Sequence, residues 1–104
     1  PDRHRLECHG KLERRDATAS YGRVDPDAPA PTMTTRCTTP ACGRFVHPTE
    51  PREITPREAA TIQTFPLTYE FRGGRGQVER QIGNAVPVRM ARGLGLCAAA
   101  LLAA

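Results

Sequence analysis

Apolar side chains recur at steps of three and four positions toward the C-terminus. The recurring positions are Val86, Met90, Leu94, Ala98, and Leu101 or Leu102. This spacing places them on one face of a helix that runs from about residue 86 toward the end of the chain. Gly93 and Gly95 weaken such a helix by up to about 1 kcal/mol each relative to alanine. We therefore expect another surface to pack against it.

A second helix is predicted by polar residues near the middle of the chain. Thr55 precedes Pro56, and Glu58 follows three positions after the threonine. A threonine in that place caps a helix start, proline suits the first helical position, and the glutamate completes a capping box. We expect this helix to end near Phe65, because Pro66 disfavours helical geometry in the residue before it.

Glycine dominates the segment between these two helices. Residues 72–76 read Arg-Gly-Gly-Arg-Gly, which predicts a flexible loop, with a short helical turn expected at residues 78–81. Such a loop is able to approach a phosphate backbone, but its plain role as a tether is the favoured interpretation. It lacks the lysine and hydroxyl residue that a phosphate-binding P-loop requires.

The first half of the chain shows no helical spacing. Prolines at positions 26, 29 and 31 push each preceding residue toward extended geometry. Residues 32–35 and 44–47 are short runs of strand-favouring type, and Gly43 allows a turn between them. Residues 1–16 are dense in charge and predict an exposed lead-in. The first half therefore predicts a loop-rich, weakly β region.

Composition limits how much core the chain is able to build. Of its 104 residues 38% are hydrophobic and only 5% aromatic, and tryptophan is absent, so few large side chains are available for burial. The net charge is +4, and 14 of the 15 basic residues are arginine. Arginine suits phosphates and guanine edges, although a coding bias toward arginine accounts for this preference equally well. The charge permits a nucleic-acid partner without demonstrating one.

The four cysteines do not form a recognisable framework. Cys8, Cys37, Cys42 and Cys97 match neither a paired metal-binding spacing nor a disulfide pattern. A zinc site built from Cys8, His9, Cys37 and Cys42 is a minor alternative, and we expect no metal. Reduced thiols in the cytoplasm of a bacterium are the favoured interpretation. No secretory signal is visible, and the apolar run from Leu94 to Ala104 is too short to cross a membrane.

Two segments carry a resemblance to a known family. Residues 52–71, REITPREAATIQTFPLTYEF, resemble the ninth conserved motif of DNA cytosine-5 methyltransferases, and residues 81–91, QIGNAVPVRMA, resemble the tenth. The order of the motifs and the short gap between them also match. Upstream, residues 20–37 and 43–48 resemble the end of a target-recognition region in a bacterial branch of that family. The chain is therefore similar to the C-terminal portion of such an enzyme.

This resemblance implies a fold class and a domain plan. The expected fold is an α+β fragment, in which a loop-rich, weakly β recognition piece precedes two helices. In the family those helices complete an α/β domain that binds S-adenosylmethionine. The plan assigns residues 1–53 to a partial target-recognition region, 54–71 to the ninth-motif helix and following segment, 72–76 to the glycine-rich loop, and 77–104 to the tenth motif and C-terminal helix. The implied partners are double-stranded DNA and an N-terminal catalytic domain, and no membrane is implied. The complete enzyme is expected to be a monomer associated with the nucleoid.

The resemblance also implies roles for individual residues. We expect the tenth motif to lie at the methionine end of the cofactor, where a helix start offers N–H groups to a carboxylate. The cofactor candidates are Asn84, Ala85 and Val86, and the DNA-binding candidates are Thr34, Thr35, Arg36, Arg44 and Arg57. The structural candidates are Thr55, Glu58, Gln63, Gly83 and Pro87, with Gly83 expected to allow a backbone conformation closed to other residues. Asn84 is expected to cap the final helix as well as to face the pocket.

The chemistry of the family requires residues that this sequence does not contain. A cysteine thiolate attacks C6 of a flipped cytosine, a glutamate engages N3, and C5 accepts the methyl group. That cysteine sits in a Pro-Cys-Gln motif, which does not occur here, and Cys37 and Cys42 have different neighbours. We therefore assign no catalytic residue to this chain and expect it to be inactive alone. The alternatives are a non-catalytic DNA-binding remnant and an unrelated zinc-dependent nucleic-acid binder.

Overall fold

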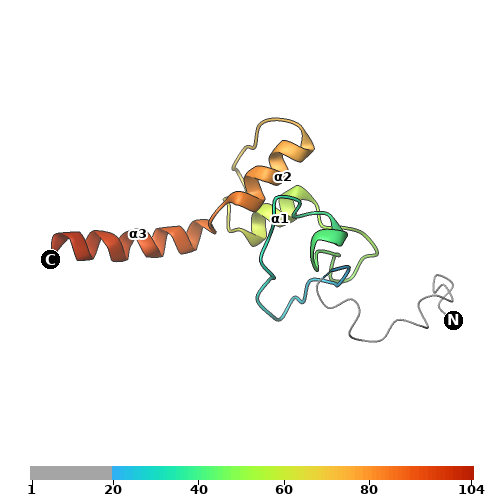
Figure 1. Cartoon of the computed structure of the whole chain (residues 1–104), viewed down its shortest axis with the longest axis horizontal. Helices are drawn as coiled ribbons and strands as arrows, with labels where there is room; N and C mark the ends of the chain where they lie inside the picture. Colours follow the sequence, from blue (N-terminus) through green and yellow to red (C-terminus); the bar gives the residue numbers. More distant parts are fainter. Residues whose placement is uncertain (1–19) are drawn as a thin grey trace.

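The computed structural model describes residues 20–104, which form a body and one projecting helix (Figure 1). Its elements are η2 (Pro40–Cys42), α1 (Pro56–Ile62), α2 (Arg75–Asn84) and α3 (Val88–Ala103). We call residues 20–53 the loop segment, residues 20–84 the body, and residues 85–87 the junction. Residues 1–16, with the predicted lead-in, Cys8 and His9, lie outside the described part.

The loop segment contains no strand among the residues that the structure describes. Its only β pairing consists of two isolated bridges, Arg23 with Val46 and Val46 with Glu53. The strands predicted at residues 32–35 and 44–47 are therefore wrong, because each offers at most one bridging residue and residues 35–38 turn instead. The α+β expectation is corrected to a helical chain with a long loop segment.

A small core joins the loop segment to the first two helices. The buried apolar residues are Cys37, Phe45, Ile54, Ala59, Ala60 and Ile82. The two alanines bring α1 close to its neighbours, while Ile82 on α2 and Phe45 on the loop segment supply the bulk. Residues far apart in the sequence therefore stabilise one another, at roughly 1.5–3 kcal/mol for each large side chain that is fully buried.

Helix α1 begins as the sequence predicted. The Glu58 amide donates to Thr55 Oγ1 at 3.2 Å, and the Thr55 amide donates to Glu58 Oε2 at 2.7 Å, so the capping box is confirmed. The helix ends at Ile62 with Gln63 as its C-cap.

Helix α2 is longer than the sequence predicted. It begins at Arg75, so the expected loop over residues 72–76 is too long, and the helical turn expected at 78–81 is part of a ten-residue helix. Gly73 turns the chain with φ of 108°, and the Gly74 amide donates to Gln77 Oε1 at 3.1 Å. The missed signal is a glycine N-cap followed three positions later by glutamine.

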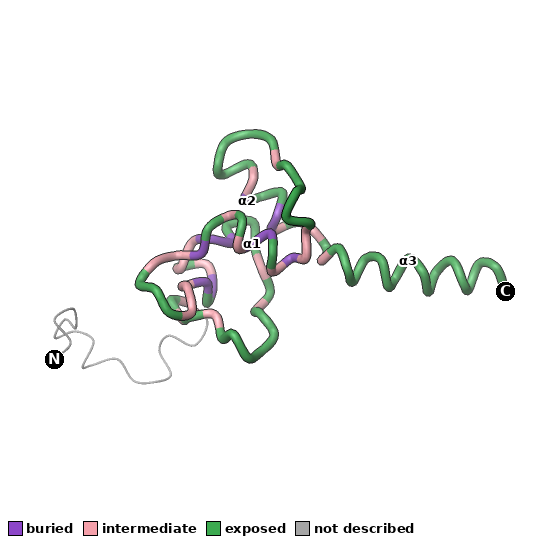
Figure 2. Tube along the Cα trace, turned by 180° about the vertical axis from the view of Figure 1, so that it is seen from behind, coloured by how far each residue is buried: buried purple, intermediate pink, exposed green. Residues whose placement is uncertain are grey.

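Helix α3 leaves the body and has no buried residue (Figure 2). The described chain is accordingly extended, with a radius of gyration of 17.3 Å against about 13 Å for a compact domain of 100 residues. Residues 75–103 together are long and apolar enough to cross a membrane. The junction interrupts that stretch, however, and the 16 residues of α3 span about 24 Å, less than the ~30 Å hydrocarbon core.

Candidate functional site

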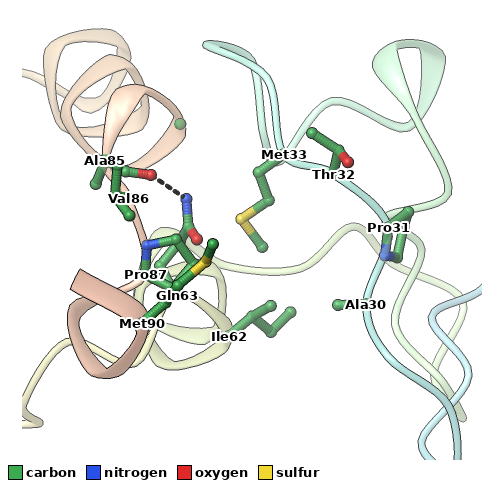
Figure 3. Close-up of a pocket in the computed structure, with 11 residues that line it drawn as sticks. Ala30, Pro31, Thr32, Met33, Ile62, Gln63, Ala85, Val86, Pro87 and Met90 are labelled. Carbon is green, nitrogen blue, oxygen red and sulfur yellow. Dashed lines mark hydrogen bonds between the residues drawn. The ribbon is translucent and has the colours of Figure 1, made fainter. Parts of the chain in front are cut away.

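A cavity of about 570 Å³ opens where the loop segment, α1 and the junction meet (Figure 3). Met33 and Ile62 face the junction across it, and Met90 on the first turn of α3 closes one side. The full lining is Ala30, Pro31, Thr32, Met33, Ile62, Gln63, Gly83, Ala85, Val86, Pro87 and Met90. The cavity thus joins residues of both motif-like segments to residues upstream of them.

Gly83 lets the loop segment approach α2 closely. A Cβ built at this position would overlap the Thr34 carbonyl oxygen and would lie 2.9 Å from the Cα of Thr35. Gly83 lies within α2 and has no positive φ. The expectation of an unusual backbone conformation is therefore wrong, and the glycine is needed because a backbone passes directly over it.

Gln63 connects α1 to the junction from a buried position. Its Nε2 donates to the carbonyl oxygens of Ile82 and Ala85, each at 3.0 Å. The Ile82 carbonyl lies in the last turn of α2 and also accepts the Ala85 amide at 3.2 Å, and the Ala85 carbonyl belongs to the junction. The expected structural role of Gln63 has a concrete form here, since its amide satisfies two carbonyls at the cavity wall.

The three cofactor candidates do not share one surface. Ala85 and Val86 line the 570 Å³ cavity, whereas Asn84 lines a separate hollow of about 450 Å³ with Gln77, Arg80 and Gln81. Asn84 is the last residue of α2, and the N-cap of α3 is Pro87. The expectation that Asn84 caps the final helix is therefore wrong, because the junction separates it from that helix start.

The start of α3 is also less open than expected. The Val88 amide donates to the Gln63 carbonyl oxygen at 3.1 Å, and the Arg89 amide donates to Thr64 Oγ1 at 3.0 Å. Two of the N–H groups expected to receive a cofactor carboxylate therefore already have acceptors. The cavity lining is mostly apolar, so it fits as one wall against the less polar parts of S-adenosylmethionine.

The DNA candidates do not share one surface. Thr35 and Arg36 line a hollow of about 630 Å³ together with Thr39, Arg80 and the start of α2. Thr34 is exposed and meets α2 through its backbone, and the exposed Arg44 packs its side chain over Gly22.

Arg57 has a different environment from the other DNA candidates. It donates to the Tyr69 carbonyl at 3.0 Å and lies 5.7 Å from the centre of the Phe71 ring. Phe71 belongs to a cluster with Phe65 and Tyr69, whose ring centres are 4.8–5.1 Å apart. The arginine is exposed, and these contacts hold its guanidinium against the segment that follows α1.

Arg52 is a structural residue that the sequence interpretation missed. Its guanidinium donates to both carboxylate oxygens of Glu58 at 2.9 Å and to Glu50 at 2.5 Å. The Arg52 contact, followed by the Thr55 amide, lowers the pKa of Glu58 to about 2. His47 Nε2 lies 3.7 Å from the same carboxylate, which gives that histidine the partner the sequence did not reveal. Arg52 is the first residue of the segment that resembles the ninth motif, and this position could have indicated its structural role.

A second polar network ties the loop segment to α2. Arg75 bridges Glu53 and Glu79, and the hydroxyl of Thr38 donates to the buried Glu79 carboxylate at 2.5 Å. Burial alone would raise the pKa of Glu79, but the hydrogen bonds from Thr38 and Arg75 lower it below its ordinary value. This network and the Gly83 contact hold the same two parts of the body together.

The cysteines in the described residues do not form a reactive centre. Burial, followed by the nearby Glu79 charge, raises the pKa of the Cys37 thiol, which disfavours a thiolate. Cys42 is half-buried, Cys97 is exposed, and residues 20–104 contain no group of three metal-binding side chains.

Comparison with known proteins gives a consistent result. A family model described as C-5 cytosine-specific DNA methylase matches residues 4–96. The type II methylase M.HgiDII of Herpetosiphon aurantiacus is 46% identical over 97 residues, covering 88% of this chain and 27% of that protein. The type II methyltransferase M1.BsuMI of Bacillus subtilis is 42% identical, and the match covers 92% of this chain and 22% of that protein. The type II methyltransferase M.AquIB of Picosynechococcus is 39% identical, and the match covers 79% of this chain and 66% of that protein. The chain thus spans about a quarter of the first two relatives.

Proposed function

Because this chain belongs to the C-5 cytosine-specific DNA methylase family, we propose that it forms the recognition and cofactor-wall part of a DNA cytosine-5 methyltransferase. The complete enzyme would transfer a methyl group from S-adenosylmethionine to C5 of cytosine in double-stranded DNA, within a bacterial restriction-modification system. The nucleophile and the main cofactor motifs would belong to a catalytic part outside this sequence.

The observation that carries this proposal is the meeting of three segments at one cavity. Thr32 and Met33 of the loop segment line it from one side, and Ala85 and Val86 of the junction line it from the other. If the loop segment approaches DNA and the junction approaches the cofactor, this arrangement sets the distance between the two. Gly83 keeps that distance short, since it lets the loop backbone rest on α2.

Each group would act by binding and orientation. S-adenosylmethionine supplies the methyl group when bound. Ala85 and Val86 would form an apolar wall beside it, and the exposed amide of Asn84 would turn toward the target base and the catalytic part. Arg36 and Arg80 lie at one hollow with Thr35 and Thr39 and would contact DNA phosphates there. Arg44 packs over Gly22, outside that hollow, and would contact phosphates separately. Arg57 would act within the fold, through Tyr69 and Phe71.

The projecting helix would join this chain to the catalytic part. Val88, Met90, Leu94, Leu96, Leu101 and Leu102 are each 38–88% exposed. A helix with such a surface is marginally stable in water by itself, because most helical stability in proteins comes from packing of an apolar face. Packing of α3 against an α/β domain would bury its apolar face and would complete a monomeric enzyme in the cytoplasm.

The test uses a hybrid enzyme, in which this chain replaces the matching segment of the Herpetosiphon aurantiacus methylase. Asn84→Ala should lower the methylation rate of duplex DNA by on the order of a hundredfold, the size expected when a catalytic pocket shifts by ~1 Å. Thr55→Ala is the control, since loss of a helix cap costs about 0.5–2 kcal/mol of stability and leaves the pocket in place. An Asn84→Ala hybrid that methylates at the parental rate would remove Asn84 from the proposed site.

A further inference from the structure

The end of α1 holds both sides of the junction between α2 and α3. Gln63 Nε2 bonds the carbonyls of Ile82 and Ala85, and the Gln63 carbonyl receives the Val88 amide. Thr64 Oγ1 receives the Arg89 amide. Two consecutive residues of one segment therefore bind the last carbonyls of one helix and the first amides of the next.

Helix α3 needs these contacts because its own N-cap offers none. Pro87 occupies that position and provides no side-chain hydrogen bond. The first amides of a helix have no acceptor within the helix and are normally satisfied by a capping side chain or water. Gln63 and Thr64 take the place of that cap from the turn that follows α1, which also fixes where α3 leaves the body.

Thr64 adopts a backbone conformation that needs a reason. Its φ is 61°, in the left-handed region that a β-branched residue rarely occupies. Hydrogen bonds from Thr64 N to Thr61 O at 2.9 Å and from Phe65 N to Ala60 O at 3.0 Å hold the turn closed. These two bonds form the turn that commonly ends a helix, in which the residue after the C-cap adopts left-handed geometry, and this turn accounts for the φ of Thr64. The hydroxyl of Thr64 then adds the contact to Arg89. A glycine would relieve the conformation but would lose the hydroxyl that receives the Arg89 amide.

We propose that Gln63 and Thr64 are positioning residues, which fix Ala85 and Val86 against the cofactor by clamping the junction. This inference rests on the proposed function, since it assumes that the junction forms a cofactor wall. Both residues act through the backbone of the junction, and Gln63 also lines the cavity itself. Loosening the clamp should therefore weaken cofactor binding more than it lowers stability.

Thr64→Gly separates the two effects in the hybrid enzyme. It removes the strain along with the hydroxyl, so the melting temperature should stay level or rise. Amide hydrogen exchange at Arg89, whose acceptor is lost, should nevertheless accelerate by about fivefold or more, the change expected when one hydrogen bond is removed from a local opening. The KM for S-adenosylmethionine should rise at least ~tenfold, within the range that small displacements in a pocket produce.

Two further variants complete the test. Thr64→Ser keeps the hydroxyl and should retain parental exchange and parental KM. Gln63→Glu keeps the shape of the side chain but replaces its amide donor. It should raise the amide exchange rate and the KM for S-adenosylmethionine, whatever it does to the melting temperature. Unchanged exchange at Arg89 in Thr64→Gly, and at Val88 and Arg89 in Gln63→Glu, would overturn the clamp. Faster exchange with a parental KM would overturn its positioning role. A parental hybrid that folds but does not bind S-adenosylmethionine would instead reject the proposed function, while the exchange data would still decide on the clamp.

Discussion

The body and α3 differ in where their apolar side chains lie. In the body, six apolar residues are buried where the loop segment, α1 and α2 meet. In α3, all 16 residues lie outside any core, and its leucines are 57–88% exposed. The body is therefore stabilised mainly by its own contacts, whereas α3 carries a surface shaped for something else. Among the hydrogen bonds of the described residues, those to Gln63 and Thr64 tie the start of α3 to the body.

The strongest test of this difference compares one apolar truncation in each region. Ile82→Ala should destabilise the chain by about 2–5 kcal/mol, because Ile82 is fully buried and its removal leaves a cavity. Leu94→Ala should change stability by less than about 0.5 kcal/mol, since this leucine is 57% exposed. Urea unfolding of the two variants measures both effects. Equal losses would mean that α3 packs on the body in solution.

A smaller effect should distinguish two glycines of α2. Gly83→Ala should destabilise the chain by about 1–3 kcal/mol, because the added methyl group would meet the backbone of Thr34. Gly76→Ala is the matched control in the same helix, where nothing lies within 4 Å of the added atom. It should stabilise by up to about 1 kcal/mol through better helix propensity. Thermal melts that move in the same direction for both variants would rule out the close contact.

The smallest expected effect is a pH dependence located at the start of α1. The pKa of Glu58 is lowered from its ordinary value of 4.5 to about 2, first by Arg52 and then by the Thr55 amide. A lowered pKa contributes stability that is present above pH 4.5 and is lost as the pH falls toward 2.

Comparison with a variant isolates this contribution. Glu58→Gln should lose less stability than the parent between those pH values. The difference should be about 0.2–1 kcal/mol, because the pair is partly exposed and screened by solvent. The exposed Glu70→Gln should behave as the parent does, and melts across this range would check it. Identical pH profiles for Glu58→Gln and the parent would mean that Arg52 does not hold this carboxylate in solution.

Local signals in the sequence predicted α1 and α3 well. The capping box of Thr55 and Glu58 depends on residues three positions apart, and the apolar face of α3 depends on a repeating spacing. Both features are local, so the sequence displays them directly. The start of α2 was missed because three glycines suggested a loop, although Gly74 and Gln77 form a helix cap there.

The features that the sequence could not predict are contacts between distant segments. Gly83 is needed because Thr34 passes over it, and no local pattern reveals that approach. The clamp depends on Thr64 reaching Arg89, 25 positions away. The strands expected in the loop segment failed for a related reason, since short β-favouring runs become strands only when a partner pairs with them. The roles expected for Ala85, Val86 and Asn84 remain predictions.

The proposed function assigns recognition and cofactor positioning in methyl transfer to this chain, and the nucleophile to another part of the enzyme. Labelled S-adenosylmethionine and cytosine-containing duplex DNA test it, with the chain alone and the hybrid enzyme measured side by side. We expect labelled DNA from the hybrid and none above a buffer control from the chain alone. Labelling by the chain alone that is lost in Cys37→Ser or Cys42→Ser, or a folded hybrid that leaves the DNA unlabelled, would contradict it.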